Sequence, residues 1–326
     1  MKRIIAVCSL AIILLVFWTA AGPVLAAKQF PSKNLIWIIP SKPGGGFDFY
    51  SRAVGRQMLK HLPKGPSIIF VNVPAGGGVE AVTRLSRAKP DGYTVGIVKV
   101  PGSIVSQLTL PFVKYDVAKL SYVGNITTDP YAVAVKKDSP LNSIKEMKEK
   151  GTVKFSTSGV GATSWVNTVI LSEEVGIQPK YVHYTSSADS ILSCVRGDSE
   201  AFLCPLFSAL PYAESGDIKF LAAFSKERVA KVPNVSTVVE AGYPRLSSLN
   251  LSRVLAAPPN TPEKYLKVLE DAFWKAVNDK EFLARLNKAK RPIIGPTRGK
   301  EARELVLSAS EVFTKYESFL KASLNK

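Results

Sequence analysis

Residues 40 to 48 have the sequence Pro40-Ser41-Lys42-Pro43-Gly44-Gly45-Gly46-Phe47-Asp48. They follow an apolar run at 34–39, which indicates a buried strand, and they precede apolar positions spaced as in a helix. Glycine allows positive φ and a close approach of the backbone to a ligand. Because unpaired N–H groups at a helix start favour an anion, this stretch predicts an anion-binding loop. Asp48 is placed either to cap the helix or to contact the ligand.

The same order of strand, glycine loop and helix occurs twice more. An apolar run at 67–73 leads into Pro74-Ala75-Gly76-Gly77-Gly78 and a helical pattern at 79–88. Another run, at 153–157, leads into Ser158-Gly159-Val160-Gly161-Ala162-Thr163 and a helical pattern ending at about 175. Ligands of open α/β sheets bind outside the carboxyl ends of the strands. The loops therefore predict a pocket lined by backbone amides.

The rest of the chain alternates between strand and helix patterns. Further strands are expected at 93–100, 120–126, 131–136, 181–185, 201–206, 218–224 and 249–257. Helices are expected at 144–150, 187–195, 208–214, 262–277, 280–290 and 300–324, with Thr261 capping the helix that begins at Pro262. This alternation argues for α/β domains with mostly parallel sheets.

The length and the order of the patterns indicate two domains. We expect a discontinuous first domain at 27–124 and 229–326, and a second domain at 125–228. Two crossings of the chain between these domains would make a hinge and a ligand cleft.

The amino-terminal residues are typical of a cleaved signal peptide at 1–26. Lys2 and Arg3 precede an apolar run at 4–18, which is short for a membrane anchor, and small residues follow at Val24-Leu25-Ala26. We therefore expect a periplasmic or otherwise extracytoplasmic protein. Losing Lys2 and Arg3 lowers the count of Lys and Arg from 43 to 41 against 26 Asp and Glu, a net charge of +15. The basic residues are scattered, which favours a solvated basic surface and no nucleic-acid partner.

Residues for catalysis or metal binding are sparse in this sequence. Cys194 and Cys204 are interpreted as unpaired, buried thiols, and His61 and His183 as a surface and a structural residue. No metal spacing, G-x-S-x-G motif, Cys–His pair or P-loop is present. The match of residues 76–81 to a dinucleotide fingerprint is weak. We expect no catalytic residue, no metal and no cofactor.

Several short motifs, in order along the chain, resemble the receptors of tripartite tricarboxylate transporters, the Bug proteins. They are Pro40 to Asp48 with Arg52, Pro74 to Gly77, Pro90 to Thr94, Asp129 to Tyr131, Ser158 to Gly161, Tyr184, Ser208 to Pro211, Val235 to Pro244, and Ala256 to Pro262. The resemblance covers nearly the whole mature chain. It implies a type II periplasmic-binding-protein fold and a monomeric receptor that hands a small carboxylate to a permease with a large and a small membrane subunit.

In such receptors the first and third glycine loops grip a carboxylate from opposite domains, through backbone amides and waters. The resemblance places these residues at the ligand: Ser41, Gly45, Gly46, Phe47, Asp48, Gly76, Gly77, Ser158, Gly159, Val160, Gly161, Ala162, Thr163, Trp165, Tyr184 and Cys204.

Some positions depart from the family pattern. Phe47 stands where a small Thr or Ser is common, Trp165 replaces a frequent His, and Cys204 with Pro205 replaces a polar pair. No Arg lies within the glycine loops to clamp several carboxylates. We therefore favour a monocarboxylate or dicarboxylate with an apolar or aromatic body over citrate, and changes in packing are the alternative interpretation.

Two other functions remain open at this point. An exported α/β enzyme acting on a carboxylate would use Ser158 or Thr163 near His183. A ligand-sensing or docking protein would bind without a role in transport.

Overall fold

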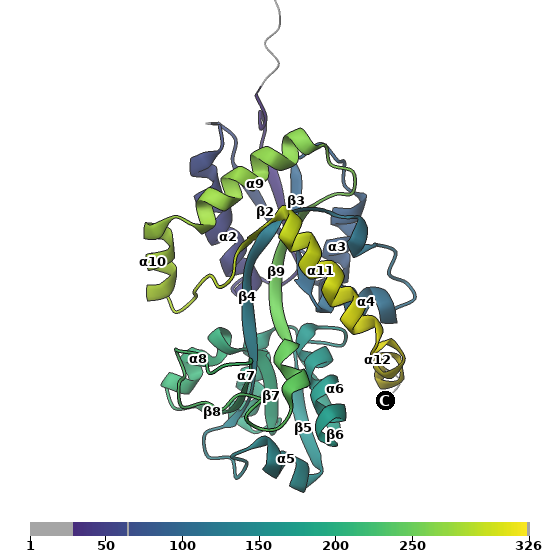
Figure 1. Ribbon diagram of the computed structural model, residues 1–326, viewed down its shortest axis with the longest axis vertical. Coiled ribbons are helices and arrows are strands. Elements are labelled where there is room, and N and C mark those ends of the chain that lie inside the picture. The colour runs from purple at the N-terminus through teal and green to yellow at the C-terminus, as the bar shows by residue number, and fades with distance from the viewer. Residues whose placement is uncertain (1–28, 64, 325–326) are drawn as a thin grey trace, which may run out of the picture.

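The computed structural model describes residues 29–63 and 65–324, so the signal peptide expected at 1–26 lies outside the described residues. Figure 1 shows two lobes, one above the other, with two long strands running between them. These strands are β4 (Ser121–Lys136) and β9 (Asn250–Ala257). The first lobe contains the glycine loops at 40–48 and 74–78, and the second lobe contains the loop at 158–163.

The first lobe is built on a mixed sheet with the strand order β2-β1-β3-β9-β4. Its parallel strands are β1 (Leu35–Ile39), β2 (Ile68–Asn72) and β3 (Thr94–Val100), while β9 and the short β10 (Thr297–Arg298) run antiparallel to their partners. Strand β1 is buried along most of its length because helices cover both faces of the sheet, which explains its continuous apolar run.

The helices of the first lobe come from both ends of the chain. They are α2 (Gly46–Met58), α3 (Val79–Arg87), α4 (Gly102–Thr109), α9 (Glu263–Val277), α10 (Lys280–Lys288), α11 (Gly299–Thr314) and α12 (Glu317–Leu324). Helix α2 packs against α9, and the fully buried Trp37 and Phe273 belong to the core beneath them. Short 3₁₀ turns occur at Leu59–His61, Ala75–Gly78, Val117–Lys119 and Pro244–Ser248.

The second lobe has its own sheet. Strand β5 (Thr152–Thr157) pairs in parallel with β6 (Gln178–His183) and β7 (Ala201–Pro205), and the second half of β4 pairs antiparallel with β7 and β8 (Ile218–Phe224). The surrounding helices are α5 (Ile144–Lys150), α6 (Thr163–Val175), α7 (Ser187–Arg196) and α8 (Leu206–Glu214).

Strand β4 corrects one prediction. Separate runs were expected at 120–126 and 131–136, but one strand of 16 residues spans both. Residues up to Pro130 pair with β9, and residues from Tyr131 pair with β7 and β8. Pro130 has no N–H to donate to a strand ladder, but it stands where β4 changes partners, so the strand continues through it.

The mostly parallel sheets that we expected are in fact mixed, because β4 and β9 run antiparallel to their neighbours.

The carboxyl-terminal helices also differ from the prediction. The single helix expected at 300–324 is two helices, because i→i−3 bonds at Lys315 and Tyr316 tighten the chain and α12 then packs against α4 and α6. Thr261 does not cap α9: its hydroxyl donates to the Pro258 carbonyl, and Pro262 is the N-cap residue. The sequence also gave no signal for α4.

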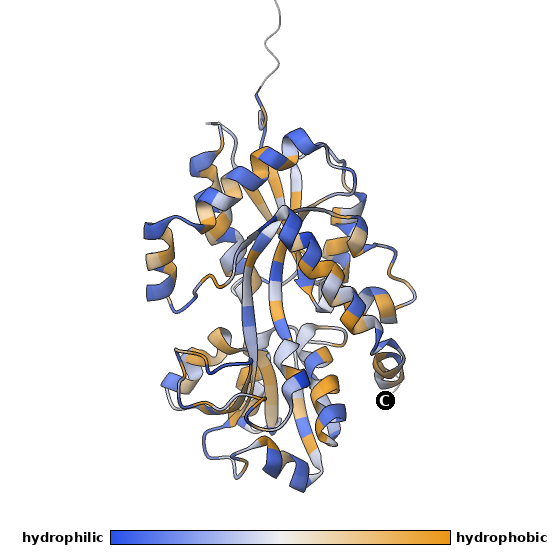
Figure 2. Cartoon of the chain, in the orientation of Figure 1, coloured by the Kyte–Doolittle hydropathy of each residue, from blue (hydrophilic) through white to orange (hydrophobic). Residues whose placement is uncertain are grey.

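The interior separates apolar cores from polar strand segments. Figure 2 shows hydrophobic colour on the inner faces of the helices and hydrophilic colour along parts of β4 and β9 between the lobes. The polar residues Thr127, Asp129, Ser252 and Arg253 lie buried in this connecting region. Cys194 and Cys204 are buried and free, as the sequence predicted.

Candidate functional site

A cavity of about 220 Å³ lies between the two lobes. Its walls come from all three glycine loops and from the start of α7, with Ser208, Tyr212 and Arg291 at the sides. A smaller inner cavity of about 50 Å³ adjoins it and shares Gly46, Phe47, Lys99 and Ser158. This meeting of loops from both lobes makes the interlobe cavity the candidate ligand site.

A larger groove of about 640 Å³ lies between α6, β6 and α12, and we call it the α6–α12 groove. It is lined by Val160, Trp165, His183 and Phe319, among others. Of the three glycine loops only Val160 reaches it, so it does not combine the backbone amides that predicted the site.

The first glycine loop is held in place by Asp48. The buried carboxylate accepts hydrogen bonds from the Gly44 N–H at 3.0 Å, Arg52 Nε at 2.8 Å and Asn72 Nδ2 at 2.9 Å. Burial alone would raise the pKa of Asp48, but these hydrogen bonds and the Arg52 charge lower it. Ser41, Gly45 and Gly46 line the cavity, whereas Asp48 supports the loop from behind.

The second glycine loop uses left-handed backbone. Gly76, Gly77 and Gly78 have φ of 60°, 63° and 97°, a region that favours glycine. Gly77 lines the cavity, and its carbonyl accepts a hydrogen bond from Lys99 Nζ. A Cβ on Gly78 would lie 2.8 Å from Lys99 Nζ, so the loop leaves no space there. Gly76 does not line the cavity.

The third glycine loop closes the cavity from the second lobe. Ser158 and Ala162 line it, and Thr163 lines the inner cavity. Gly159, at φ 117°, and Gly161, at φ 74°, shape the turn without lining either cavity. A Cβ on Gly77 would lie 3.5 Å from the Val160 carbonyl, so the second and third loops approach each other across the cleft.

The aromatic residues expected at the ligand are divided between different environments. Phe47 lines both cavities. Trp165 is 1% exposed and lies against the α6–α12 groove, and Tyr184 lines neither cavity of the site. Cys204 is buried behind the site, where its Sγ contacts the Pro205 carbonyl, and Pro205 itself lines the inner cavity. The apolar surface offered to a ligand is therefore smaller than the sequence suggested.

Sequence reasoning missed the cations of the site. Lys99 comes from the end of β3, Arg253 from β9 and Arg291 from the segment after α10, and all three line the cavities. For Lys99 and Arg253 the sequence did contain a signal, because each is the single charged residue in an otherwise largely apolar strand pattern. Lysine and arginine are rarely fully buried without a partner, so such a position marks a possible site.

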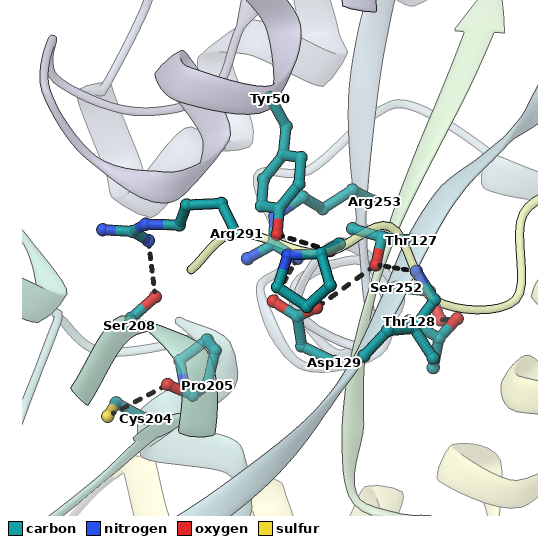
Figure 3. A network of polar contacts seen from close by, with 12 residues as sticks. Tyr50, Thr127, Thr128, Asp129, Cys204, Pro205, Ser208, Ser252, Arg253 and Arg291 are labelled. Carbon is teal, nitrogen blue, oxygen red and sulfur yellow. Dashed lines mark hydrogen bonds and ion pairs between the residues drawn. The ribbon is translucent and has the colours of Figure 1, made fainter. Parts of the chain in front are cut away.

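Arg253 is paired with an acid, while its Nε is buried without a hydrogen-bond partner. Its Nη1 donates to Asp129 Oδ2 at 2.6 Å, and both side chains are almost completely buried (Figure 3). The guanidinium also lies 4.6 Å from the Tyr50 ring centroid and 5.3 Å from that of Phe47. Burial raises the pKa of Tyr50, which keeps this ring neutral.

Arg291 links the two lobes. Its Nη1 donates to the Ser208 hydroxyl at 3.3 Å, so a first-lobe side chain reaches α8 across the cavity (Figure 3). The guanidinium also lies 5.7 Å from the centroid of the Phe49 ring.

Helix starts add to the positive character of the cavity. Gly46, Thr163 and Ser187 are the first residues of α2, α6 and α7, and each lines the interlobe or the inner cavity. Helix N-termini carry partial positive charge and free N–H groups. No acidic side chain lines either cavity among the described residues. The arrangement is suited to binding an anion.

The enzyme alternative lacks its base. His183 Nδ1 lies 2.7 Å from the Thr157 hydroxyl, and His183 lines the α6–α12 groove, away from the cavity of Ser158 and Thr163. The Ser158 hydroxyl is hydrogen-bonded to Ser164 at 2.8 Å. No cluster of His, Cys, Asp or Glu in the described residues could hold a metal ion.

Two α/β lobes joined by two strands around a shared cavity define a periplasmic-binding-protein fold, and the solved structure of the periplasmic binding protein BugD matches it, with a TM-score of 0.76. The model of the tripartite tricarboxylate transporter family receptor matches residues 51–297, so the chain belongs to this family of substrate-binding receptors, which are not enzymes. The resemblance to Bug proteins and the predicted fold class are confirmed.

The relatives cover most of the chain. BugT of Bordetella pertussis is 27% identical over 270 residues, which cover 80% of this chain and 81% of BugT. MatC from Rhodopseudomonas palustris, solved with bound malate, has a TM-score of 0.79 at 24% identity and covers 89% of this chain and 100% of its own. Another R. palustris protein, solved with adipate, has a TM-score of 0.79 at 22% identity and covers 89% of this chain and 98% of its own.

Among the described residues, no helix has the length and apolar character needed to cross a membrane.

Proposed function

We propose that this receptor captures a small carboxylate in the interlobe cavity and delivers it to a membrane permease with a large and a small subunit. One observation carries the proposal: backbone loops from both lobes, helix N-termini and four cationic side chains line the two adjoining cavities, which have no lining acid among the described residues. The cations are Lys42, Lys99, Arg253 and Arg291. Such a site favours a carboxylate over a neutral or cationic solute.

The proposal includes where and how the protein works. A signal peptide at 1–26 would direct a monomer to the periplasm. Strands β4 and β9 would be the hinge, since both run between the lobes (Figure 1). Residues 229–249 pack on the second lobe, so the second domain would extend from about residue 125 past residue 228 to the start of β9. Ligand contacts from both lobes would stabilise the closed arrangement.

The geometry changes our hypothesis about the ligand. An apolar or aromatic body was inferred from Phe47, Trp165 and Tyr184, of which only Phe47 lines the cavity. The absence of arginine from the glycine loops was a correct observation, but Arg253 and Arg291 reach the site from other segments. Polar anions such as short dicarboxylates therefore suit the cavity better.

Calorimetry of the purified mature chain tests the receptor proposal. The panel contains citrate, succinate, glutamate, benzoate and branched aliphatic acids, and we expect at least one acid to bind at one ligand per chain with no product formed. At a hundred times its Kd, that ligand should raise the free energy of unfolding by about 2.7 kcal/mol. Turnover, or no binding by any carboxylate including those released from the purified protein, would overturn the proposal.

A further inference from the structure

Lys99 is a buried cation without an acidic partner. Its side chain is 7% exposed, and its Nζ donates to the Gly77 carbonyl. The ammonium has three N–H donors, and this carbonyl accepts a hydrogen bond from only one of them. No ion pair of the described residues includes Lys99, and the ring of Phe47 lies 5.9 Å away. Burying an unpaired charge costs free energy, so a buried lysine without an acidic partner suggests a functional role.

The position of Lys99 in the cavity wall indicates what this role is. It lines both the interlobe cavity and the inner cavity, so it stands where the two join. The other fully buried cation of the site, Arg253, is neutralised by Asp129. A ligand that fills the cavity would therefore meet an uncompensated ammonium at Lys99, while the glycine loops and helix starts offer a separate set of backbone N–H groups.

We propose that Lys99 determines specificity by pairing with a second carboxylate of the ligand, so that the receptor selects dicarboxylates over monocarboxylates of equal length. This inference rests on the proposed function, because it assigns a partner within the same site. One carboxylate would bind the backbone amides, and the other would form a charge-assisted hydrogen bond with the ammonium. A monocarboxylate would satisfy the first set and leave Lys99 unpaired.

Matched ligands separate the two carboxylates. Succinate, glutarate and adipate are each compared by calorimetry with the corresponding half-amide, which has the same length and one negative charge less. We expect the wild-type protein to bind the preferred dicarboxylate roughly tenfold to hundredfold more tightly than its half-amide, the range for a hydrogen bond to a charged group.

Matched variants assign that preference to one residue. Lys99→Met should weaken binding of the dicarboxylate roughly tenfold or more and leave the half-amide nearly unchanged, and Lys99→Arg should keep part of the preference. Lys42 is the control, because it lines the same cavity but is exposed, so Lys42→Met should preserve the preference. A melting curve of each variant shows that it is folded.

The outcomes distinguish this inference from the receptor proposal. Equal affinity for dicarboxylate and half-amide in the wild type, or an unchanged preference in folded Lys99→Met, overturns the role of Lys99 while carboxylate binding stands. No binding of any acid overturns the receptor proposal itself.

Discussion

The cavity contains two buried cations with opposite environments. Arg253, on β9, forms a buried ion pair with Asp129 on β4 at 2.6 Å, in the region where the chain passes between the lobes. Lys99, at the end of β3, has a carbonyl and an aromatic ring beside it and no acid. The two cationic side chains therefore have different roles. Arg253 stabilises the pairing of β9 with β4, and Lys99 provides an uncompensated positive charge at the cavity.

This difference predicts opposite effects on stability. Removing one partner of a buried pair leaves a charge without compensation, whereas removing a buried cation that has no acidic partner takes an unfavourable charge away. Stability measurements on the two positions therefore test whether the cations are as different as their surroundings indicate.

Arg253→Met should produce the largest loss. We expect the free energy of unfolding to fall by about 3–5 kcal/mol, because Asp129 is left buried and unpaired. Urea unfolding without ligand measures this. Lys99→Met should keep at least the wild-type stability, and adding Asp129→Asn to Arg253→Met should restore part of the loss. A stable Arg253→Met protein would show that the pair contributes little.

Gly46→Val should have the next largest effect, on binding. A Cβ at Gly46 would lie 3.2 Å from Arg253 Nη2 and 3.7 Å from the Ser208 hydroxyl, so a branched side chain would enter the cavity. We expect at least about a hundredfold loss of affinity, equal to about 2.7 kcal/mol, with a cooperative unfolding transition retained. Calorimetry with the preferred acid measures the loss.

Two glycines nearby provide the comparison. A Cβ at Gly45 would have only the Lys42 carbonyl within reach, at 3.9 Å, so Gly45→Val should weaken binding less than Gly46→Val, although Gly45 also lines the cavity. Gly161→Val should also abolish binding, with an added cost in stability because its φ of 74° strains any other residue. Wild-type affinity in Gly46→Val would make the first loop a structural element only.

Local patterns were sufficient to predict most of the fold. The glycine loops and the helices after them depend on neighbouring residues, so α2, α3 and α6 begin close to their expected positions. The continuation of β4 through Pro130 depends on partners that are distant in sequence, so the pattern gave two strands. The break between α11 and α12 likewise follows from packing on α4 and α6.

The sequence predicted the backbone loops of the site but not the cationic side chains that line it. Lys99 and Arg253 reach the cavity because β3 and β9 are adjacent in the sheet, a tertiary fact that spacing does not encode. Trp165 follows a gripping loop, but α6 is buried on nearly every face, so proximity to the loop does not fix where this ring points. Asp48 gave an ambiguous signal, and its contacts with Gly44 and Arg52 make it a support of the loop.

The pH dependence of binding should report the charge on Lys99. Burial lowers the pKa of Lys99 to about 8 in the protein without ligand. A bound dicarboxylate favours the ammonium and raises this pKa. Affinity should therefore change little between about pH 6 and 7, where both ligand carboxylates are ionised, and should fall above pH 8 by up to about tenfold, or about 1.4 kcal/mol, per pH unit. Burial raises the pKa of Tyr131, which lines the inner cavity, and of Cys204, which lies behind it, so both stay neutral near pH 8.

Two further measurements make this pH prediction specific. Lys99→Met should lose the pH dependence above pH 8 together with the preference for dicarboxylates. The protein without ligand should gain stability from this group between about pH 8 and its ordinary value of 10.5, because the unfolded chain holds the proton that the folded chain has released. A wild-type affinity that stays constant to pH 10 would contradict the assignment.

The smallest expected effect concerns the contact between the lobes. Arg291 Nη1 donates to the Ser208 hydroxyl at 3.3 Å, from the first lobe to α8 (Figure 3). Lys290 and Glu214 form a second contact between the lobes, on the exposed surface. A double-mutant cycle of Ser208→Ala and Arg291→Ala should give a coupling of about 0.5–1.5 kcal/mol in ligand affinity. The hydrogen bond should stabilise the closed arrangement that binds, but at 3.3 Å it is long, so its effect should be that of an ordinary hydrogen bond. The matched cycle of Lys290→Ala and Glu214→Ala should give less than about 0.5 kcal/mol, since water screens an exposed pair.

Small-angle scattering of Ser208→Ala without ligand should show a larger radius of gyration than the wild type. Equal coupling in the two cycles would mean that closure depends on the ligand and the strands alone, and that the Arg291–Ser208 contact is incidental to it.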